Sequence, residues 1–259
     1  MTTIESINCQ AGIASLAETR PSWNFPPANL KLESGEVHIW LAQLDKVENA
    51  VEFEQMISED ERVRADRFRF DLHRKQFVAA RGFLRIILGK YLQTNPRQLY
   101  FKYNKYGKPA MGEEYQSAIE FNLSHSDNLA LYAVAFNREI GIDLERLKPS
   151  WIEEAMVFQC LTPQETAHFQ SLPENERNLY FFDCWTRKEA YLKACGNGLS
   201  LPVNQIETSL SSEFSMSLLR GDSASRPTFG SFQTLPSIPG YAAALAVEGT
   251  DPQLKFWMP

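Results

Sequence analysis

The segment of the chain with the strongest chemical signal runs from Trp185 to Leu199 and contains Glu189 and Lys193. Its apolar spacing predicts a helix that ends at Gly196. At about 100° per residue, Glu189 lies about 20° from Phe182, on the apolar face of that helix. An isolated charge on an apolar face is costly to bury, so this carboxylate needs a cation, a metal or a proton.

A second acidic cluster lies upstream, at Asp143 and Glu145. These residues are two apart on a predicted strand, so both side chains project from the same face. Two such carboxylates repel each other unless a cation lies between them. Together with Glu189 they predict a Mg²⁺ site, with Mn²⁺ as the alternative metal, because Mg²⁺ takes oxygen ligands, waters and substrate phosphates. Lys193 is the other candidate partner for Glu189.

A polar segment from Phe121 to Ser126 follows a predicted strand and includes Ser124 and His125. No G-x-S-x-G pattern surrounds the serine, which argues against a hydrolase. A hydroxyl and an imidazole are better suited to binding phosphate, although an ordinary polar turn has the same composition. Lys108, on a predicted tight turn, is interpreted as either a solvated lysine or a phosphate ligand.

Composition and charge limit the classes of protein that fit. The chain has 259 residues, 44% hydrophobic, and a net charge of −6, which argues against general nucleic-acid binding. Its four cysteines have no C-x-x-C spacing, and no segment is apolar for the roughly 20 residues a membrane helix needs. We therefore expect a cytoplasmic protein with reduced thiols. The segment from Glu61 to Arg85 contains eight basic residues and three acidic ones, which indicates either a site for an anionic partner or a solvated helix face.

The pattern of elements predicts an α+β fold with two pseudo-symmetric halves, each a long helix packed on a small, mostly antiparallel sheet. We expect an irregular arm over residues 1–30, a first half over 31–137 and a second half over 138–259, with the active site in the cleft between them. A capping box is predicted at Thr162 to Glu165. The predicted long helices span 74–92 and 178–195, and the predicted strands are 37–41, 99–103, 119–123, 129–136, 139–145 and 241–247.

Taken together, three blocks of sequence resemble the 4′-phosphopantetheinyl transferase superfamily, in its larger Sfp-type class. The blocks are Phe121–Ser126, Gly141–Glu145 and Trp185–Lys193, and the W-x-x-K-E-x-x-x-K then G-x-G-L pattern is met in full. The similarity spans about residues 62–202. It implies that the chain moves the phosphopantetheine arm of coenzyme A onto a serine of an acyl or peptidyl carrier protein, and releases adenosine 3′,5′-bisphosphate. It also implies a monomer.

The resemblance further assigns roles by position. Mg²⁺ on the pyrophosphate would be bound by Asp143, Glu145 and Glu189. Glu189, or a water beside it, would take the proton from the carrier serine, and Lys193 would stabilise the charge that develops as the bond breaks. The residues that would bind coenzyme A or contact the acidic carrier are Lys108, Ser124, His125, Arg64, Lys75 and Arg81.

Two other hypotheses stay open at this point. A different Mg²⁺-dependent enzyme acting on a nucleotide diphosphate would keep the acids but need no carrier. A carrier-binding module without turnover is disfavoured, because every expected acid and Lys193 are present.

Overall fold

The structure is a computed structural model that describes residues 23–46, 50–115, 117–148, 152–196, 202–208, 216–218, 231–235 and 238–259. Most of the predicted N-terminal arm, with Cys9, and the Asn197–Leu199 turn lie outside the described residues. Residues 23–30 form no regular element apart from one β-bridge between Asn24 and Trp257.

The helices and strands follow one another in runs along the chain: β1, then three helices, five strands, three helices and five strands. The helices are α1 (Ala50–Met56), α2 (Glu59–Ala65), α3 (Asp71–Leu92), α4 (Glu154–Cys160), α5 (Pro163–Ser171) and α6 (Glu174–Ala194). The strands are β1 (Glu36–Gln43), β2 (Phe101–Tyr103), β3 (Pro109–Met111), β4 (Ile119–Ser126), β5 (Leu129–Phe136), β6 (Ile140–Arg146), β7 (Ile206–Thr208), β8 (Met216–Leu218), β9 (Ser231–Thr234), β10 (Tyr241–Val247) and β11 (Gln253–Trp257).

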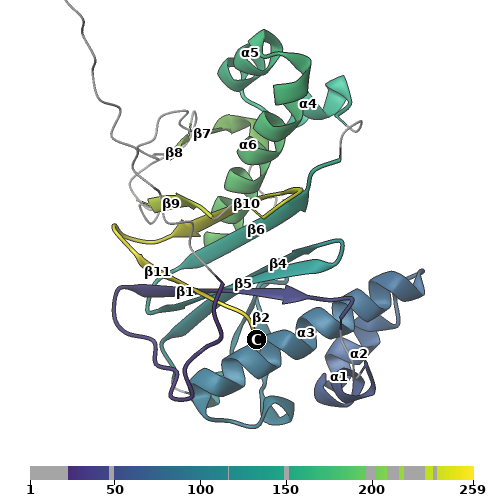
Figure 1. Cartoon of the computed structure of the whole chain (residues 1–259), viewed down its shortest axis with the longest axis vertical. Coiled ribbons are helices and arrows are strands. Elements are labelled where there is room, and N and C mark those ends of the chain that lie inside the picture. Colours follow the sequence, from purple (N-terminus) through teal and green to yellow (C-terminus); the bar gives the residue numbers. More distant parts are fainter. Residues whose placement is uncertain are drawn as a thin grey trace, which may run out of the picture.

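Two sheets lie between two long helices, as Figure 1 shows from α6 down to α3. The first sheet has strand order β11-β1-β5-β4 and the second has β6-β10-β9. An apolar layer joins the sheets, with Ile39 and Leu131 on one side and Ile142 and Leu245 on the other, all fully buried. The α+β prediction, with one long helix on each small sheet, is confirmed.

Helix α3 covers the outer face of the first sheet. Its apolar residues recur at helical spacing, so Ala80, Leu84, Ile87 and Leu88 pack against Trp40 of β1. The helix ends where Gln93 adopts a left-handed conformation (φ 49°). The predicted helix over residues 74–92 is therefore confirmed, with three additional residues at its start.

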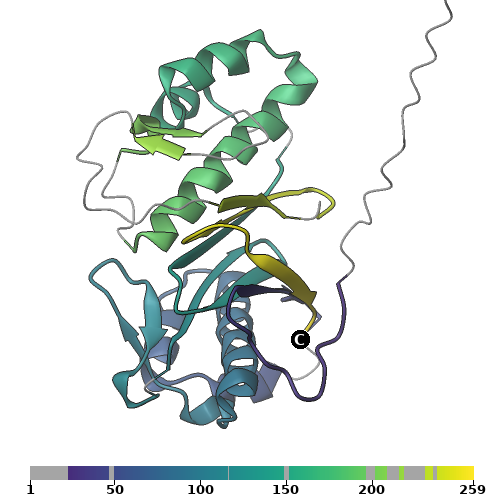
Figure 2. The ribbon, with the colours of Figure 1, turned by 90° about the vertical axis from the view of Figure 1, so that its left-hand side faces the viewer.

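Helix α6 lies along the second sheet (Figure 2), and one glycine fixes how closely it approaches. A Cβ on Gly141 of β6 would lie 2.0 Å from the carbonyl oxygen of Ala190 and 2.4 Å from the backbone nitrogen of Ala194. Only a residue without a side chain fits there. The helix ends at Ala194, and Gly196 follows two residues later with a φ of +64°, which suits glycine.

The structure corrects two sequence-based expectations about strands. Strand β4 continues through Ser126, so Ser124 and His125 lie within the strand, not just past it. The sequence did not predict this, because Ser124, His125 and Ser126 lack the alternation of apolar and polar residues that is typical of a strand, although they pair with β5. Strand β11 was not predicted. It pairs in parallel with β1, and its residues are only partly buried, so its sequence lacks a clear pattern.

The two sheets meet where edge strand β4 lies against edge strand β6. Asn122 of β4 accepts a hydrogen bond on its side-chain oxygen from the backbone nitrogen of Ile142 (3.0 Å). Ser126, on the same face of β4, accepts one from the backbone nitrogen of Arg146 (3.1 Å). Side chains thus take the place of ladder hydrogen bonds along this seam, which leaves room between the sheets.

Within the described part of the chain, no helix combines the length and the apolar character needed to span a membrane. Cys160 and Cys184 are buried free thiols, as the absence of C-x-x-C spacing predicts.

Candidate active site

A cavity of about 620 Å³ opens along the seam between β4 and β6. Its walls come from α2, α3, the β2–β3 turn and β4 on one side, and from β6 and α6 on the other. Of the residues assigned to the site from sequence, it brings together Arg64, Arg81, Lys108, Ser124, His125, Asp143, Glu145, Glu189 and Lys193.

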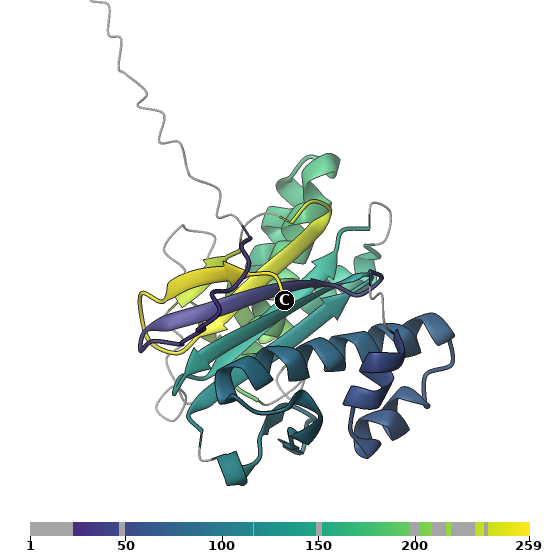
Figure 3. The same ribbon diagram turned by 60° about the horizontal axis from the view of Figure 1, so that its bottom comes forward.

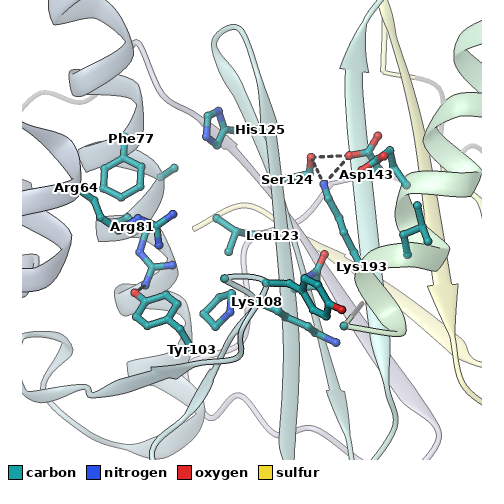
Figure 4. Close-up of a pocket in the computed structure, with 18 of the residues that line it drawn as sticks. Arg64, Phe77, Arg81, Tyr103, Lys108, Leu123, Ser124, His125, Asp143 and Lys193 are labelled. Atoms are coloured by element: carbon teal, nitrogen blue, oxygen red, sulfur yellow. Dashed lines mark hydrogen bonds and ion pairs between the residues drawn. The ribbon is translucent and has the colours of Figure 1, made fainter. Parts of the chain in front are cut away.

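Helix α6 presents Glu189 and Lys193 one turn apart toward the cavity. The Lys193 ammonium donates to Asp143 Oδ1 (2.6 Å) and to Ser124 Oγ (2.9 Å). Ser124 Oγ in turn donates to Asp143 Oδ1 (2.9 Å), which closes a triangle drawn with dashed lines in Figure 4. A cation, an anion and a hydroxyl from three different elements are therefore held together where the two sheets meet.

The acids of β6 face the cavity from alternate positions, as the strand period requires. Asp143 is 3% exposed, and its Oδ2 has no hydrogen-bond partner among the residues that the structure describes. Glu145 accepts a hydrogen bond from Ser126 Oγ (3.0 Å). Burial, with the neighbouring Asp143 charge, raises the pKa of Glu145. The pair therefore favours a nearby positive charge.

Burial and the neighbouring acids disfavour the charged form of Glu189. Burial, followed by the charge of Asp143, raises its pKa to about 6, which the Lys193 ammonium only partly offsets. Its Oε1 is buried and accepts no hydrogen bond from the described part of the chain. The sequence-based inference that Glu189 lies on an inward face is confirmed by this burial.

The donor set fits a hard divalent cation. Asp143 Oδ2 and Glu189 Oε1 are buried oxygens that nothing in the described chain satisfies. Among the described residues, no three acidic, histidine or cysteine side chains converge as a preformed metal cluster. Mg²⁺ is usually held by one or two carboxylates, with waters and substrate phosphates completing its shell, so these two oxygens are suitable ligands for it.

The candidate phosphate-binding residues differ in how accessible they are. His125 is exposed and lines the cavity, as does Arg64, whose guanidinium lies 5.5 Å from the Tyr103 ring centre. The Lys108 ammonium instead donates to Glu139 (3.1 Å) and to the carbonyl oxygen of Ala194 (3.0 Å). Lys108 therefore joins the β2–β3 turn to the end of α6.

Two basic residues have other surroundings than the sequence suggests. Arg81 lines the cavity but is 4% exposed, forms an ion pair with buried Glu61 and donates to the Tyr103 hydroxyl (2.8 Å). Lys75 does not line this cavity. It lies at a second, smaller cavity on the other flank of α3, because α3 turns residue 75 away from the face that carries Phe77 and Arg81.

Sequence reasoning missed the partner of Lys188, the residue next to Glu189. Lys188 is fully buried, donates to the carbonyl oxygen of Cys160 (2.7 Å) and forms an ion pair with Glu165 (2.5 Å). Glu165 also accepts hydrogen bonds from the backbone nitrogen and the hydroxyl of Thr208 (2.8 and 2.6 Å). The capping box correctly predicted the start of α5 at Thr162 but gave no sign of this second role of Glu165.

Comparison with known proteins identifies the family of this chain. The sequence profile of the 4′-phosphopantetheinyl transferase superfamily matches residues 139–246, and that of the 4′-phosphopantetheinyl transferase N-terminal region matches residues 40–137. The 4′-phosphopantetheinyl transferase HetI of Nostoc sp. is 41% identical over 91% of this chain and 98% of its own length. The 4′-phosphopantetheinyl transferase Sfp of Bacillus subtilis is 30% identical over 77% of this chain and 85% of its own.

The chain is thus a transferase in which two sheets enclose an acidic, lysine-bearing cavity. It belongs to the 4′-phosphopantetheinyl transferase superfamily, and the resemblance drawn from its three sequence blocks is confirmed.

Proposed function

We propose that this protein transfers the 4′-phosphopantetheine arm of coenzyme A to a serine of an apo acyl or peptidyl carrier protein. Adenosine 3′,5′-bisphosphate is the other product. One observation supports the proposal most strongly: a single cavity of a chain that belongs to this family is lined by Asp143, Glu145, Glu189 and Lys193. A nucleotide diphosphate enzyme of another class would not align over 91% of its length with such a transferase.

In this proposal Asp143, Glu145 and Glu189 hold Mg²⁺, and Mn²⁺ is the alternative. The bound metal would neutralise charge on the pyrophosphate of coenzyme A. The two unsatisfied oxygens of Asp143 and Glu189 support this assignment.

The chain's own residues would position the reactants and handle the proton. Lys193, already paired with Asp143, would stabilise the negative charge on the bridging oxygen as the bond breaks. Glu189, or a water beside it, would accept the proton of the carrier serine. His125 and Arg64 would contact phosphates of coenzyme A, since both reach the cavity. Ser124 would orient Lys193 and Asp143, and Lys108 and Arg81 would form the walls.

The division into halves at residues 137–138 stays part of the proposal, as do a monomeric state and a cytoplasmic location. The two family profiles abut between residues 137 and 139, which supports the division. Strand β11 departs from it, because it belongs to the second segment by sequence and to the first sheet by pairing.

The experiment is intact-mass spectrometry of an apo carrier protein incubated with this protein, coenzyme A and Mg²⁺. We expect a mass gain equal to one phosphopantetheine arm, which EDTA abolishes. Glu189→Gln should lose most turnover and stay folded, whereas Leu179→Gln, an exposed change on the same helix, should keep it. No gain with several carriers and no binding of coenzyme A would overturn the proposal.

A further inference from the structure

The turn between β2 and β3 is organised by the side chain of Asn104. Its Oδ1 accepts hydrogen bonds from the backbone nitrogens of Tyr106 (2.9 Å) and Lys108 (3.0 Å). An asparagine oxygen that accepts from the backbone two residues further on forms an Asx turn, which fixes the loop locally. Figure 3 shows α3 lying across the strands of the first sheet, and the chain that follows α3 and carries this turn projects away from the sheet. One amide oxygen therefore sets the shape of the projecting turn.

The nitrogen of the same amide reaches α6. Asn104 Nδ2 donates to the carbonyl oxygen of Gly196 (2.7 Å), a residue 92 positions further along the chain. Lys108, from the same turn, donates to the carbonyl oxygen of Ala194 (3.0 Å). The approach is close, since a Cβ on Gly196 would lie 3.2 Å from Asn104 Nδ2. In Figure 2 the turn lies next to the end of α6, to which two of its side chains are bonded.

These two bonds cap the C-terminal end of α6 from outside the helix. The last carbonyl oxygens of a helix have no partner within it, and Ala194 is the last residue of α6. The ammonium of Lys108 is also favourable at the negative end of the helix dipole. Lys193, whose ammonium binds Asp143, lies in the capped turn. The β2–β3 turn and the catalytic end of α6 are thus held together by side chains of the turn.

Both sides of this contact line the catalytic cavity, but Asn104 does not. Asn104 lies instead at a neighbouring cavity of about 480 Å³. Its amide can therefore hold two walls of the catalytic cavity together without touching a bound ligand. The wall residues that the contact joins are Tyr106, Gly107 and Lys108 from the turn and Leu192, Lys193 and Gly196 from the end of α6.

We propose that Asn104 is a positioning residue, which clasps the β2–β3 turn to the end of α6 and so fixes the width of the cavity for coenzyme A. The amide oxygen shapes the turn, and the amide nitrogen joins the turn to the helix. The identity of the ligand rests on the proposed function. Loss of the Nδ2 donor loosens the wall that carries Tyr106 and Lys108, so coenzyme A binds less tightly, whereas the groups that act in the transfer step stay in place.

The first test uses two variants that separate the two ends of the amide. Asn104→Asp keeps an oxygen for the turn and loses the donor. Asn104→Ser is uncharged, keeps a hydroxyl that accepts from the turn, and is too short to reach Gly196. Coenzyme A is titrated into each protein with Mg²⁺ and without carrier, in an isothermal calorimeter.

We expect both variants to bind coenzyme A about three- to tenfold more weakly, as the loss of one hydrogen bond does. In the carrier-modification assay, the KM for coenzyme A should rise by the same factor and kcat should stay within about twofold. Asn137→Asp is the matched control, because Asn137 is an exposed turn residue that lines neither cavity. Weaker binding in Asn104→Asp alone indicates charge repulsion, and weaker binding in Asn104→Ser alone indicates a weaker turn. Either result, or unchanged binding in both variants, overturns the proposal.

The second test measures the clasp without coenzyme A, by hydrogen exchange. The amides of Cys195 and Gly196 donate to Tyr191 and Lys193 and close the last turn of α6. They should exchange several-fold faster in both Asn104 variants than in the unaltered protein, and unchanged exchange overturns the proposal. If the unaltered protein fails to bind coenzyme A, the transferase proposal fails, and the exchange rates still decide whether Asn104 clasps α6.

Discussion

Gly141→Ala tests whether the close packing of α6 on β6 sets the catalytic geometry. The new Cβ would lie 2.0 Å from the Ala190 carbonyl oxygen, about 1.4 Å inside the 3.4 Å at which ordinary contact begins. Both nearest atoms are backbone, so no side-chain rotation relieves the contact. The helix must move away from the strand, and Glu189 and Lys193 must move with it.

The expected cost follows from these distances. Overpacking a core by one methyl group typically costs about 1–3 kcal/mol, which in a domain of this size lowers Tm by about 2–12 °C. A catalytic group misplaced by about 1 Å can lose on the order of 100-fold in rate. We therefore expect a folded variant with kcat reduced about 100-fold, and a smaller change in the KM for the carrier.

The assay is carrier modification followed by intact mass, with circular dichroism and a thermal scan on the same preparation. Gly112→Ala is the matched control, because the three atoms nearest to a Cβ there belong to the carboxylate of Glu114, the far end of a flexible side chain. A folded Gly141→Ala protein with unaltered kcat would refute the reasoning that the position of α6 controls the site.

Three further predictions concern buried or acidic groups. Lys188→Met should destabilise the fold by about 3–5 kcal/mol in urea unfolding, because it leaves the Glu165 carboxylate buried and unpaired; adding Glu165→Gln should recover part of the loss. Burial lowers the pKa of His38 below its usual 6.5, so the unfolded chain binds more protons below that pH, and the free energy of unfolding should fall as the pH drops from 7.5 to 5.5. His38→Gln should flatten that fall, and equal slopes in both proteins would contradict it. Asp143→Asn should abolish the rise in Tm that Mg²⁺ and coenzyme A together give the unaltered protein, measured by a thermal scan.

Much of the fold follows from local sequence signals. The two long helices have clear apolar periodicity and a glycine or left-handed stop, and β5 and β10 are continuous apolar runs of strand length, so all four were predictable. Strand β11 was not, because its stability depends on pairing with β1, more than 200 residues away, and not on its own pattern.

The site was predictable in its acids but not in its hydrogen bonds. Asp143 and Glu145 are two residues apart on a strand, so their spacing alone predicts that both side chains lie on the same face. The sequence motif in α6 identifies Glu189 as the third acid. The pairing of Lys193 with Asp143 and Ser124 depends on how β4, β6 and α6 meet, which no local pattern encodes. Lys75 was misplaced for a related reason, since a basic cluster on a helix indicates charge but not which flank faces the cavity.

The position of β11 has a consequence for how the chain folds during synthesis. Strand β1 is made early, yet one of its two neighbours comes from residues 253–257, so the first sheet cannot be completed until those residues leave the ribosome. Until then β1 exposes a row of unpaired backbone groups, the kind of edge on which chains aggregate. Contacts this distant in sequence slow folding. A nascent chain stalled before β11 is therefore a natural substrate for chaperones, and fragments that end at the boundary between the two halves should be poorly behaved on their own.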